Sequence, residues 1–132
     1  MKLGLDTSVV LRLLIGQPAD HAAVARERLA QAHTDGDEVI VIGTVLGEAY
    51  HALVHHYHVD KDQARHLLHR MVTSGAVQPE PPELATALEP AAGAGLVDRL
   101  ILHGYRSLQA STLTFDRALG AAGAVRLNPN TA

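Results

Sequence analysis

The sequence predicts an α/β fold in which a mainly parallel sheet lies between two layers of helices. Segments with the composition of strands alternate along the chain with segments of helical periodicity, which is the pattern of parallel sheets with crossover helices. Residues 39–42 form a continuous β-branched run, which is typical of a strand buried on both faces. A chain of 132 residues is long enough for one core, and we expect a single domain over residues 1–132.

The first half of the chain predicts two strands and four helices. Gly16-Gln17-Pro18 interrupts the first helix, and apolar residues at helical spacing continue in the second. Asp60 followed by Gln63 has the pattern of a capping box. In order, the expected elements are a strand over 2–5, a helix capped by Thr7 or Ser8 that ends at Ile15, a helix over 20–32, a strand over 39–42, and helices over 43–57 and 60–72.

The second half predicts shorter elements. Prolines punctuate residues 79–82, Pro90 stops a helix, and Gly95 precedes another. The expected elements are a strand over 76–77, a helix over 83–88, a helix over 96–108, a strand over 111–115, a helix over 116–119 and a strand over 125–127. We expect residues 128–132 to form a frayed tail.

Composition excludes several classes of protein. The chain has no cysteine, so disulfides, thiolate nucleophiles and cysteine-ligated zinc are excluded. No apolar run approaches the roughly 18 residues of a membrane span, and Met1-Lys2 leads directly into a strand without a signal peptide. We therefore expect a cytoplasmic protein. All basic residues except Lys2 and Lys61 are arginine, which suits phosphate contacts, although GC-rich coding explains the same bias.

Two aspartates follow predicted strands. Asp6 closes the run Leu3-Gly4-Leu5, and Asp116 closes a second apolar run. Ligands bind at the carboxyl ends of strands in α/β sheets, so both positions are candidates for a site. The alternative for Asp6 is a structural role as the N-cap of the next helix.

Two further carboxylates lie on helix faces that the sequence predicts to be buried. Glu48 shares a face with positions 45, 49 and 52, and Asp98 shares one with Ile101 and Leu102. Glu48 would otherwise lie at the edge of this face and reach water. Asp98 would otherwise pair with Arg99 or Arg106, although adjacent residues diverge on a helix.

In the simplest topology these four acids meet at one edge of the sheet. Buried carboxylates are costly unless they are paired or bound to a cation. The set therefore predicts a metal ion and hydrolytic chemistry.

At these positions the chain resembles the PIN-domain ribonucleases, and in particular the VapC-type toxins of bacterial toxin–antitoxin pairs. The order and spacing of the motifs carry the resemblance, which extends from Lys2 to Leu127. The four motifs are Leu5-Asp6-Thr7-Ser8-Val9, Gly47-Glu48-Ala49, Val97-Asp98-Arg99-Leu100-Ile101 and Thr114-Phe115-Asp116-Arg117.

The resemblance implies a three-layer α/β/α sandwich that hydrolyses RNA phosphodiester bonds with Mg²⁺ or Mn²⁺. Asp6 and Asp98 would bind the ion directly, and Glu48 and Asp116 would complete the pocket, directly or through water. Thr7, Ser8 and Thr114 would orient carboxylates or water. The resemblance also implies a cognate antitoxin that blocks the site, and a homodimer.

Other interpretations remain open. One alternative is a PIN-fold module that binds RNA or protein without nuclease activity. Another is an aspartyl-phosphate phosphatase, which usually has a second acid where Ser8 stands. A histidine-rich stretch leaves a metal site conceivable, but we interpret it as a solvated face. It contains His51, His55, His56, His58, His66 and His69.

Overall fold

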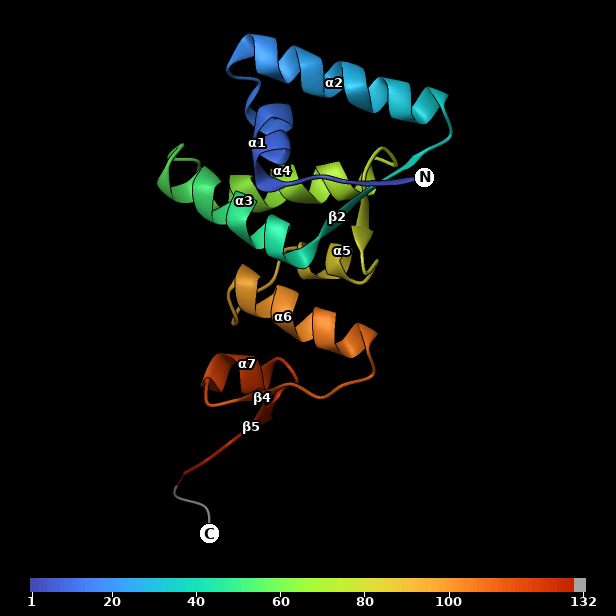
Figure 1. Cartoon of the computed structure of the whole chain (residues 1–132). Coiled ribbons are helices and arrows are strands. Elements are labelled where there is room, and N and C mark those ends of the chain that lie inside the picture. The colour runs from blue at the N-terminus through green and yellow to red at the C-terminus, as the bar shows by residue number, and fades with distance from the viewer. Residues whose placement is uncertain (130–132) are drawn as a thin grey trace.

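The computed structural model describes residues 1–129 and has the expected alternation of strands and helices (Figure 1). In chain order the elements are β1 (Lys2–Gly4), α1 (Thr7–Ile15), α2 (Ala19–Thr34), β2 (Glu38–Ile42), α3 (Gly43–His55), α4 (Lys61–Thr73), β3 (Gln78–Glu80), α5 (Leu84–Ala87), α6 (Leu96–Ser107), β4 (Leu113–Thr114), α7 (Arg117–Ala121) and β5 (Val125–Arg126).

The N-terminal strands form a parallel sheet in the order β1-β2-β3. Leu3 pairs with Val39, and Val41 pairs with Pro79. Val39 and Val41, on one face of the central strand β2, are almost completely buried, whereas on the other face Ile40 is half-buried and Ile42 is exposed. The expected burial of this run on both faces is therefore only partly confirmed. Parallel strands with helices around them confirm the predicted α/β class.

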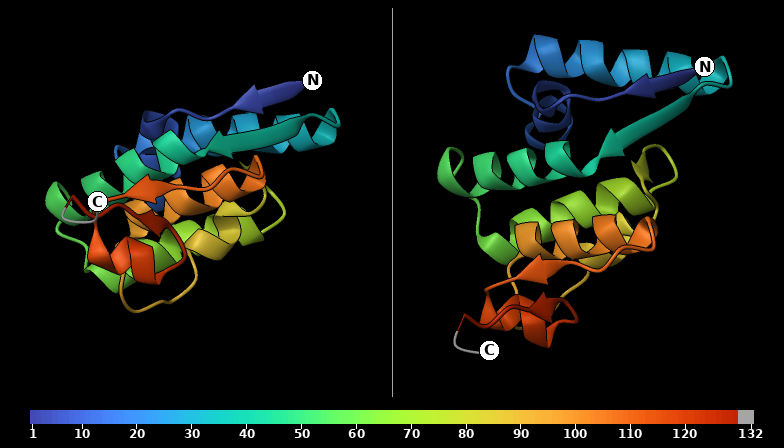
Figure 2. Two further views of the ribbon diagram at one scale, coloured as in Figure 1. Left: turned by 90° about the horizontal axis from the view of Figure 1, so that it is seen from below. Right: turned by 60° about the horizontal axis from the view of Figure 1, so that its bottom comes forward.

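The last two strands form a separate parallel sheet, in which Leu113 pairs with Val125. Figures 1 and 2 show β4, α7 and β5 at the far end of an elongated molecule, with α6 between them and the three-stranded sheet. The strands expected to share one sheet edge are thus divided between two sheets.

Two apolar clusters explain this division. The main core contains the fully buried Leu46, Leu53 and Leu68, and α6 contributes Leu96 and Leu100 to it. A second cluster joins the other side of α6 to the C-terminal elements; its buried members are Ala94, Leu102, Leu119 and Ala124. Helix α6 therefore packs on both groups of elements and holds them apart.

Most predicted elements are confirmed to within a few residues, with two local differences. Asp6, and neither Thr7 nor Ser8, is the N-cap of α1. The third strand lies at Gln78–Glu80 rather than 76–77. A proline is compatible with this strand because β3 lies at the edge of its sheet. Of the expected tail, residues 130–132 lie outside the described residues.

We predict that Leu53→Ala lowers the free energy of unfolding by about 2–5 kcal/mol, because it leaves a cavity in the main core. Leu108→Ala is the matched control, since this leucine is 75% exposed and its truncation should cost less than about 0.5 kcal/mol. Urea denaturation of both variants measures the difference. Equal losses would contradict the assignment of the core.

Candidate active site

Asp6 lies where β1 ends and α1 begins. Its Oδ1 accepts hydrogen bonds from the Ser8 hydroxyl at 2.6 Å and from the backbone N–H of Val9 at 3.2 Å. These donors, the Ser8 hydroxyl first, hold the pKa of Asp6 below its ordinary value. Asp6 is therefore the N-cap of α1, as the structural alternative proposed. Both hydrogen bonds reach Oδ1, and within residues 1–129 no hydrogen bond is described for Oδ2.

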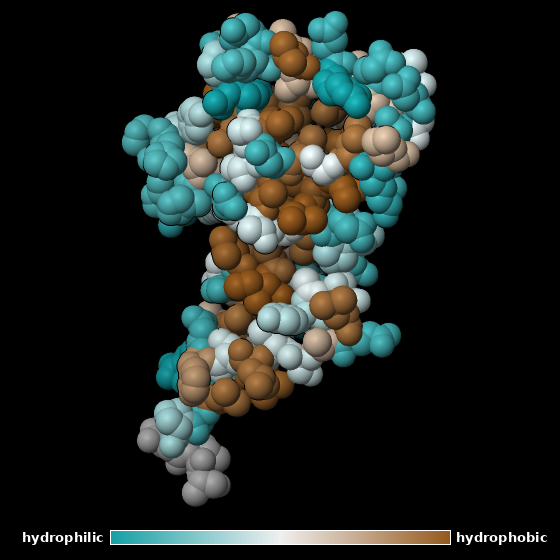
Figure 3. All heavy atoms as spheres, in the orientation of Figure 1, coloured by the Kyte–Doolittle hydropathy of each residue, from teal (hydrophilic) through white to brown (hydrophobic). Residues whose placement is uncertain are grey.

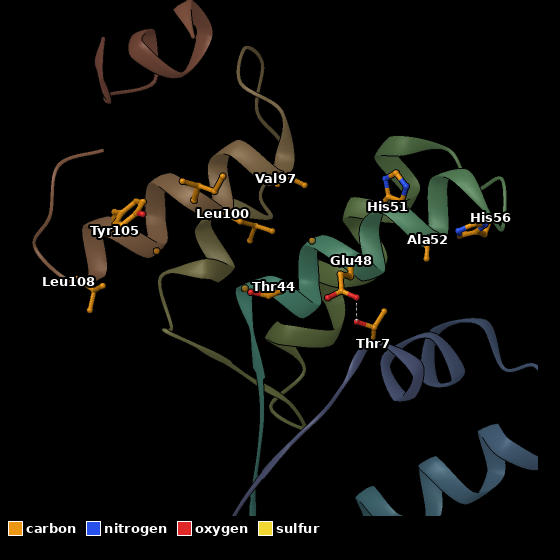
Figure 4. A pocket seen from close by; sticks show the side chains of 14 residues that line it. Thr7, Thr44, Glu48, His51, Ala52, His56, Val97, Leu100, Tyr105 and Leu108 are labelled. Carbon is orange, nitrogen blue, oxygen red and sulfur yellow. Dashed lines mark hydrogen bonds between the residues drawn. The ribbon is translucent and has the colours of Figure 1, made fainter. Parts of the chain in front are cut away.

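Glu48 is linked to α1 by a hydrogen bond from Thr7, the first residue of that helix. The Thr7 hydroxyl donates a hydrogen bond to Glu48 Oε2 at 3.3 Å, which Figure 4 shows between the start of α1 and the middle of α3. Glu48 is exposed, whereas positions 45, 49 and 52 of its predicted face are buried or half-buried. This agrees with the alternative in which Glu48 lies at the edge of the face and reaches water. The buried face of α3 consists of Leu46, Ala49 and Leu53, which leaves Glu48 at the rim of a groove.

This groove, of about 960 Å³, runs between α3 and α6. Apolar side chains of α6 form one wall, and Glu48 and His51 stand on the other (Figure 4). The sequence analysis missed this wall, although its residues recur at helical spacing; they are Val97, Ile101, Tyr105 and Leu108. The acid Glu48 therefore stands beside an accessible, mainly apolar surface.

Asp98 lies in the first turn of α6 and is half-buried. Here a negative charge is favourable because it opposes the positive end of the helix dipole. It lines a small hollow together with His51, His55 and Lys61. The predicted faces were partly wrong, since Ile101 is exposed while Leu102 is buried.

Neither arginine proposed as an alternative partner contacts Asp98. The Arg99 guanidinium donates to the backbone oxygens of Ala87 and Ala94 at 3.0 and 2.7 Å, and Arg106 donates to the backbone oxygen of Ala122 at 3.2 Å. The pKa of Arg99 is lowered by burial. Within residues 1–129, the Asp98 carboxylate forms no hydrogen bond or ion pair, which leaves its oxygens available to a ligand.

Asp116 repeats the local arrangement of Asp6 in the second sheet. It is the N-cap of α7, and its Oδ1 accepts the backbone N–H of Leu119 at 2.9 Å. Its own N–H donates to the Thr114 hydroxyl oxygen at 3.0 Å. The Thr114 hydroxyl thus fixes the backbone that carries the acid.

The structure brings together only part of the predicted set. Asp6 and Glu48 are linked through Thr7, whereas Asp116 belongs to a sheet that does not contain β1. Within residues 1–129 no group of three or more His, Asp or Glu side chains is placed to hold a metal ion. The oxygen donors suit a hard divalent cation, but one copy of the chain does not assemble a complete ligand set.

The PIN domain profile matches residues 4–124, which is nearly the whole chain. The chain belongs to the PIN-domain family. A search of curated proteins finds no match. PIN domains are typically metal-dependent nucleases that bind RNA. Asp6 caps α1, and Glu48 and Asp98 lie on α3 and α6; in this PIN domain α3 contacts both α1 and α6.

The histidines of this PIN domain do not form the metal site considered above. His51, His55 and His58 would share one face only if the helix continued to His58. Helix α3 ends at His55, and His58 has a positive φ of 54°, so this shared face does not form. His51 and His55 instead lie with their ring centroids 4.4 Å apart and their planes tilted by 41°.

In the described part of the chain, no helix is long and apolar enough to cross a membrane.

We predict that Ser8→Ala raises the pKa of Asp6, because it removes the principal hydrogen bond to the ionised carboxylate. A lowered pKa in the folded state contributes stability above the unfolded-state pKa, and this contribution is lost as the pH falls through the folded-state pKa. In Ser8→Ala this contribution should therefore be smaller, and its loss on acidification should be complete at a higher pH.

Titration of the side-chain carboxyl by ¹³C NMR measures this shift. Ser107→Ala is the matched control, since the Ser107 hydroxyl donates to the Gly104 backbone oxygen and does not touch Asp6. An unchanged Asp6 titration in Ser8→Ala would show that the Ser8 hydroxyl does not stabilise the carboxylate.

Proposed function

We propose that this PIN domain is a divalent-metal-dependent endoribonuclease and the toxin of a toxin–antitoxin pair. The observation that carries the nuclease proposal is the contact between Thr7 and Glu48, which places two motif acids at the junction of α1 and α3. The toxin role is supported by the VapC-like motifs described above.

We propose Mg²⁺ or Mn²⁺ as the ion and four acids as its ligands, Asp6, Glu48, Asp98 and Asp116; within residues 1–129 they are not grouped closely enough to bind one ion, so binding requires that they come closer together. Such an ion lowers the pKa of bound water and offsets the charge that develops on a phosphate. The chain itself positions the carboxylates. Ser8 and Val9 donate hydrogen bonds to Oδ1 of Asp6, and Thr7 donates one to Glu48.

The alternative chemistries receive less support. In an aspartyl-phosphate phosphatase a second acid usually stands two residues after the nucleophile, whereas here Ser8 holds that position and donates its hydroxyl to Asp6. A binding module without nuclease activity has no need for Asp98, a half-buried charge without a described partner. That residue therefore distinguishes a nuclease from a binding module.

We predict that the purified protein cleaves RNA in Mg²⁺ or Mn²⁺ and not in chelator, and that Asp98→Asn abolishes cleavage. The substitution keeps the shape of the side chain and removes one charge from a group of acids that repel one another. In chelator Asp98→Asn should melt at or above the wild-type temperature, while Mn²⁺ should stabilise the wild type more than the variant.

The assays are gel analysis of a panel of structured RNAs and melting curves in chelator and in Mn²⁺. Asp35→Asn is the matched control, because Asp35 lies in a turn and accepts a hydrogen bond only from Gln31 among the described side chains. Equal cleavage in chelator would refute the metal requirement. An Asp98→Asn protein that melts well below the wild type in chelator would identify Asp98 as structural.

We predict that expression of the chain alone arrests bacterial growth and that the product of a neighbouring antitoxin gene restores it. A basic side chain of the antitoxin is expected to reach the carboxylates, because a fixed cation can take the place of a metal ion there. Colony counts after induction measure the effect, with Asp98→Asn as the inactive control. Equal arrest by wild type and Asp98→Asn would separate any toxicity from cleavage.

A further inference from the structure

Two histidines near the end of α3 form a close pair that the nuclease proposal leaves unexplained. His51 and His55 are four positions apart, so their side chains follow one another on one face of the helix. Their ring centroids are 4.4 Å apart. His58 lies beyond the helix and does not share this face. The pair therefore belongs to α3 alone and does not depend on the rest of the histidine-rich stretch.

The spacing of this pair suits a single transition-metal ion. Two histidines at i and i+4 of a helix can bind one Zn²⁺ from the same face. Imidazole nitrogens about 2.0–2.1 Å from one ion lie roughly 3 Å from each other. Rings with centroids 4.4 Å apart can each direct one nitrogen toward an ion at that spacing. Within residues 1–129 neither ring forms a hydrogen bond or an ion pair, so both are available to a ligand.

The pair is open to solvent. His51 and His55 are both exposed. Figure 3 shows hydrophilic residues gathered where α3 ends and α4 begins, beside a hydrophobic surface over α6. An ion can therefore reach the two rings from water without any movement of the apolar core.

A hollow of about 270 Å³ brings a carboxylate to the same place. Its walls come from the end of α3 and the start of α6, and it is lined by both histidines and by Asp98. Asp98 is half-buried, and its carboxylate has no hydrogen bond or ion pair within residues 1–129. Lys61 also lines the hollow, but it is exposed, and its long side chain can turn the charge toward water. Two imidazoles and one carboxylate form a ligand set that suits Zn²⁺.

The donor set distinguishes this hollow from the proposed Mg²⁺ or Mn²⁺ site. Imidazole nitrogen suits Zn²⁺, Ni²⁺ and Cu²⁺, whereas Mg²⁺ prefers carboxylate and water oxygens. Within residues 1–129 no three His, Asp or Glu side chains are already placed around one ion. The two histidines, which are already close together, would therefore bind first. Asp98 would join them by rotation of its side chain.

We propose that His51 and His55 bind a Zn²⁺ ion with Asp98 as the third ligand, and that this ion inhibits the nuclease by withdrawing Asp98 from its site. Glu48, His51 and His55 lie at i, i+3 and i+7 and share one side of α3, so the Zn²⁺ is held about one to two helical turns from Glu48. A carboxylate bound to this ion is no longer available to a second one. The inhibition rests on the proposed function, whereas the Zn²⁺ site stands on the histidine pair and the hollow.

Isothermal titration calorimetry with Zn²⁺ tests the site in protein purified without a histidine tag. We expect one Zn²⁺ per chain. His51→Ala and His55→Ala should each lower the affinity at least about tenfold, because the loss of even a group that only supports a metal ligand costs about 10–100-fold. His66→Ala is the matched control and should leave the affinity unchanged, since His66 is exposed on α4 and makes no ring contact within residues 1–129.

A wild type that binds no Zn²⁺ would overturn the proposal. An equal loss of affinity in His55→Ala and His66→Ala would also overturn it, because binding would then be spread over the surface histidines. Asp98→Asn should weaken binding by less than His55→Ala does. Unchanged binding in Asp98→Asn would remove Asp98 from the ligand set and refute the inhibition. A variant that does not fold, as judged by circular dichroism, is replaced by the corresponding glutamine variant for histidine or alanine variant for Asp98.

Cleavage assays in Mg²⁺ test the inhibition. Added Zn²⁺ should slow the wild type, and the Zn²⁺ concentration that halves each protein's own cleavage rate should be at least about tenfold higher for His55→Ala than for the wild type. Equal inhibition of both proteins would place the inhibitory ion elsewhere and overturn this step. A wild type that cleaves RNA in neither Mg²⁺ nor Mn²⁺ would refute the proposed function and the inhibition with it, and calorimetry would still decide the Zn²⁺ site.

Discussion

The parallel pairing of β1 with β2 is the interaction on which the candidate site depends. Each of these strands leads almost directly into a helix, so their register fixes where α1 and α3 begin. The N–H of Leu5 donates to the Ile40 backbone oxygen at 3.0 Å, which extends the pairing to the residue before Asp6. Thr7 can therefore reach Glu48 across the junction, although 41 positions separate them in the sequence.

Strand pairing also leaves two edge strands, β1 and β4, each with one unpaired side within residues 1–129. Parallel strands are ordinarily covered on both faces and paired within a larger sheet. Strand β2 is paired on both sides, and its Val39 and Val41 are buried on one face, although Ile42 on the other face is 49% exposed. Within residues 1–129, strands β1 and β4 are each paired on one side only, and Leu113 of β4 is 64% exposed.

Local features of the sequence predicted the order of the elements well, because capping residues, prolines and hydrophobic periods act within a few residues. The partition of the strands into two sheets was not predictable in this way, since strand pairing depends on residues far apart in the chain. Glu48 illustrates a second limit. The spacing of α3 groups residues on faces, but the burial of Leu46 and Leu53 decides which face meets the core. The candidate acids were found because they interrupt apolar patterns, and their grouping depends on topology.

The helix caps give the four acids of this PIN domain unequal evolutionary freedom. Asp6 and Asp116 each hold the first turn of a helix, so a descendant that lost nuclease activity would still be selected to keep a capping residue at both positions. Glu48 receives a single hydrogen bond in the middle of α3, and Asp98 supports the start of α6 only through the helix dipole, so neither is a capping residue. Among related chains, replacement of Glu48 or Asp98 would therefore be a better indicator that a lineage has lost nuclease activity than the state of the two capping positions, which stay under selection for stability.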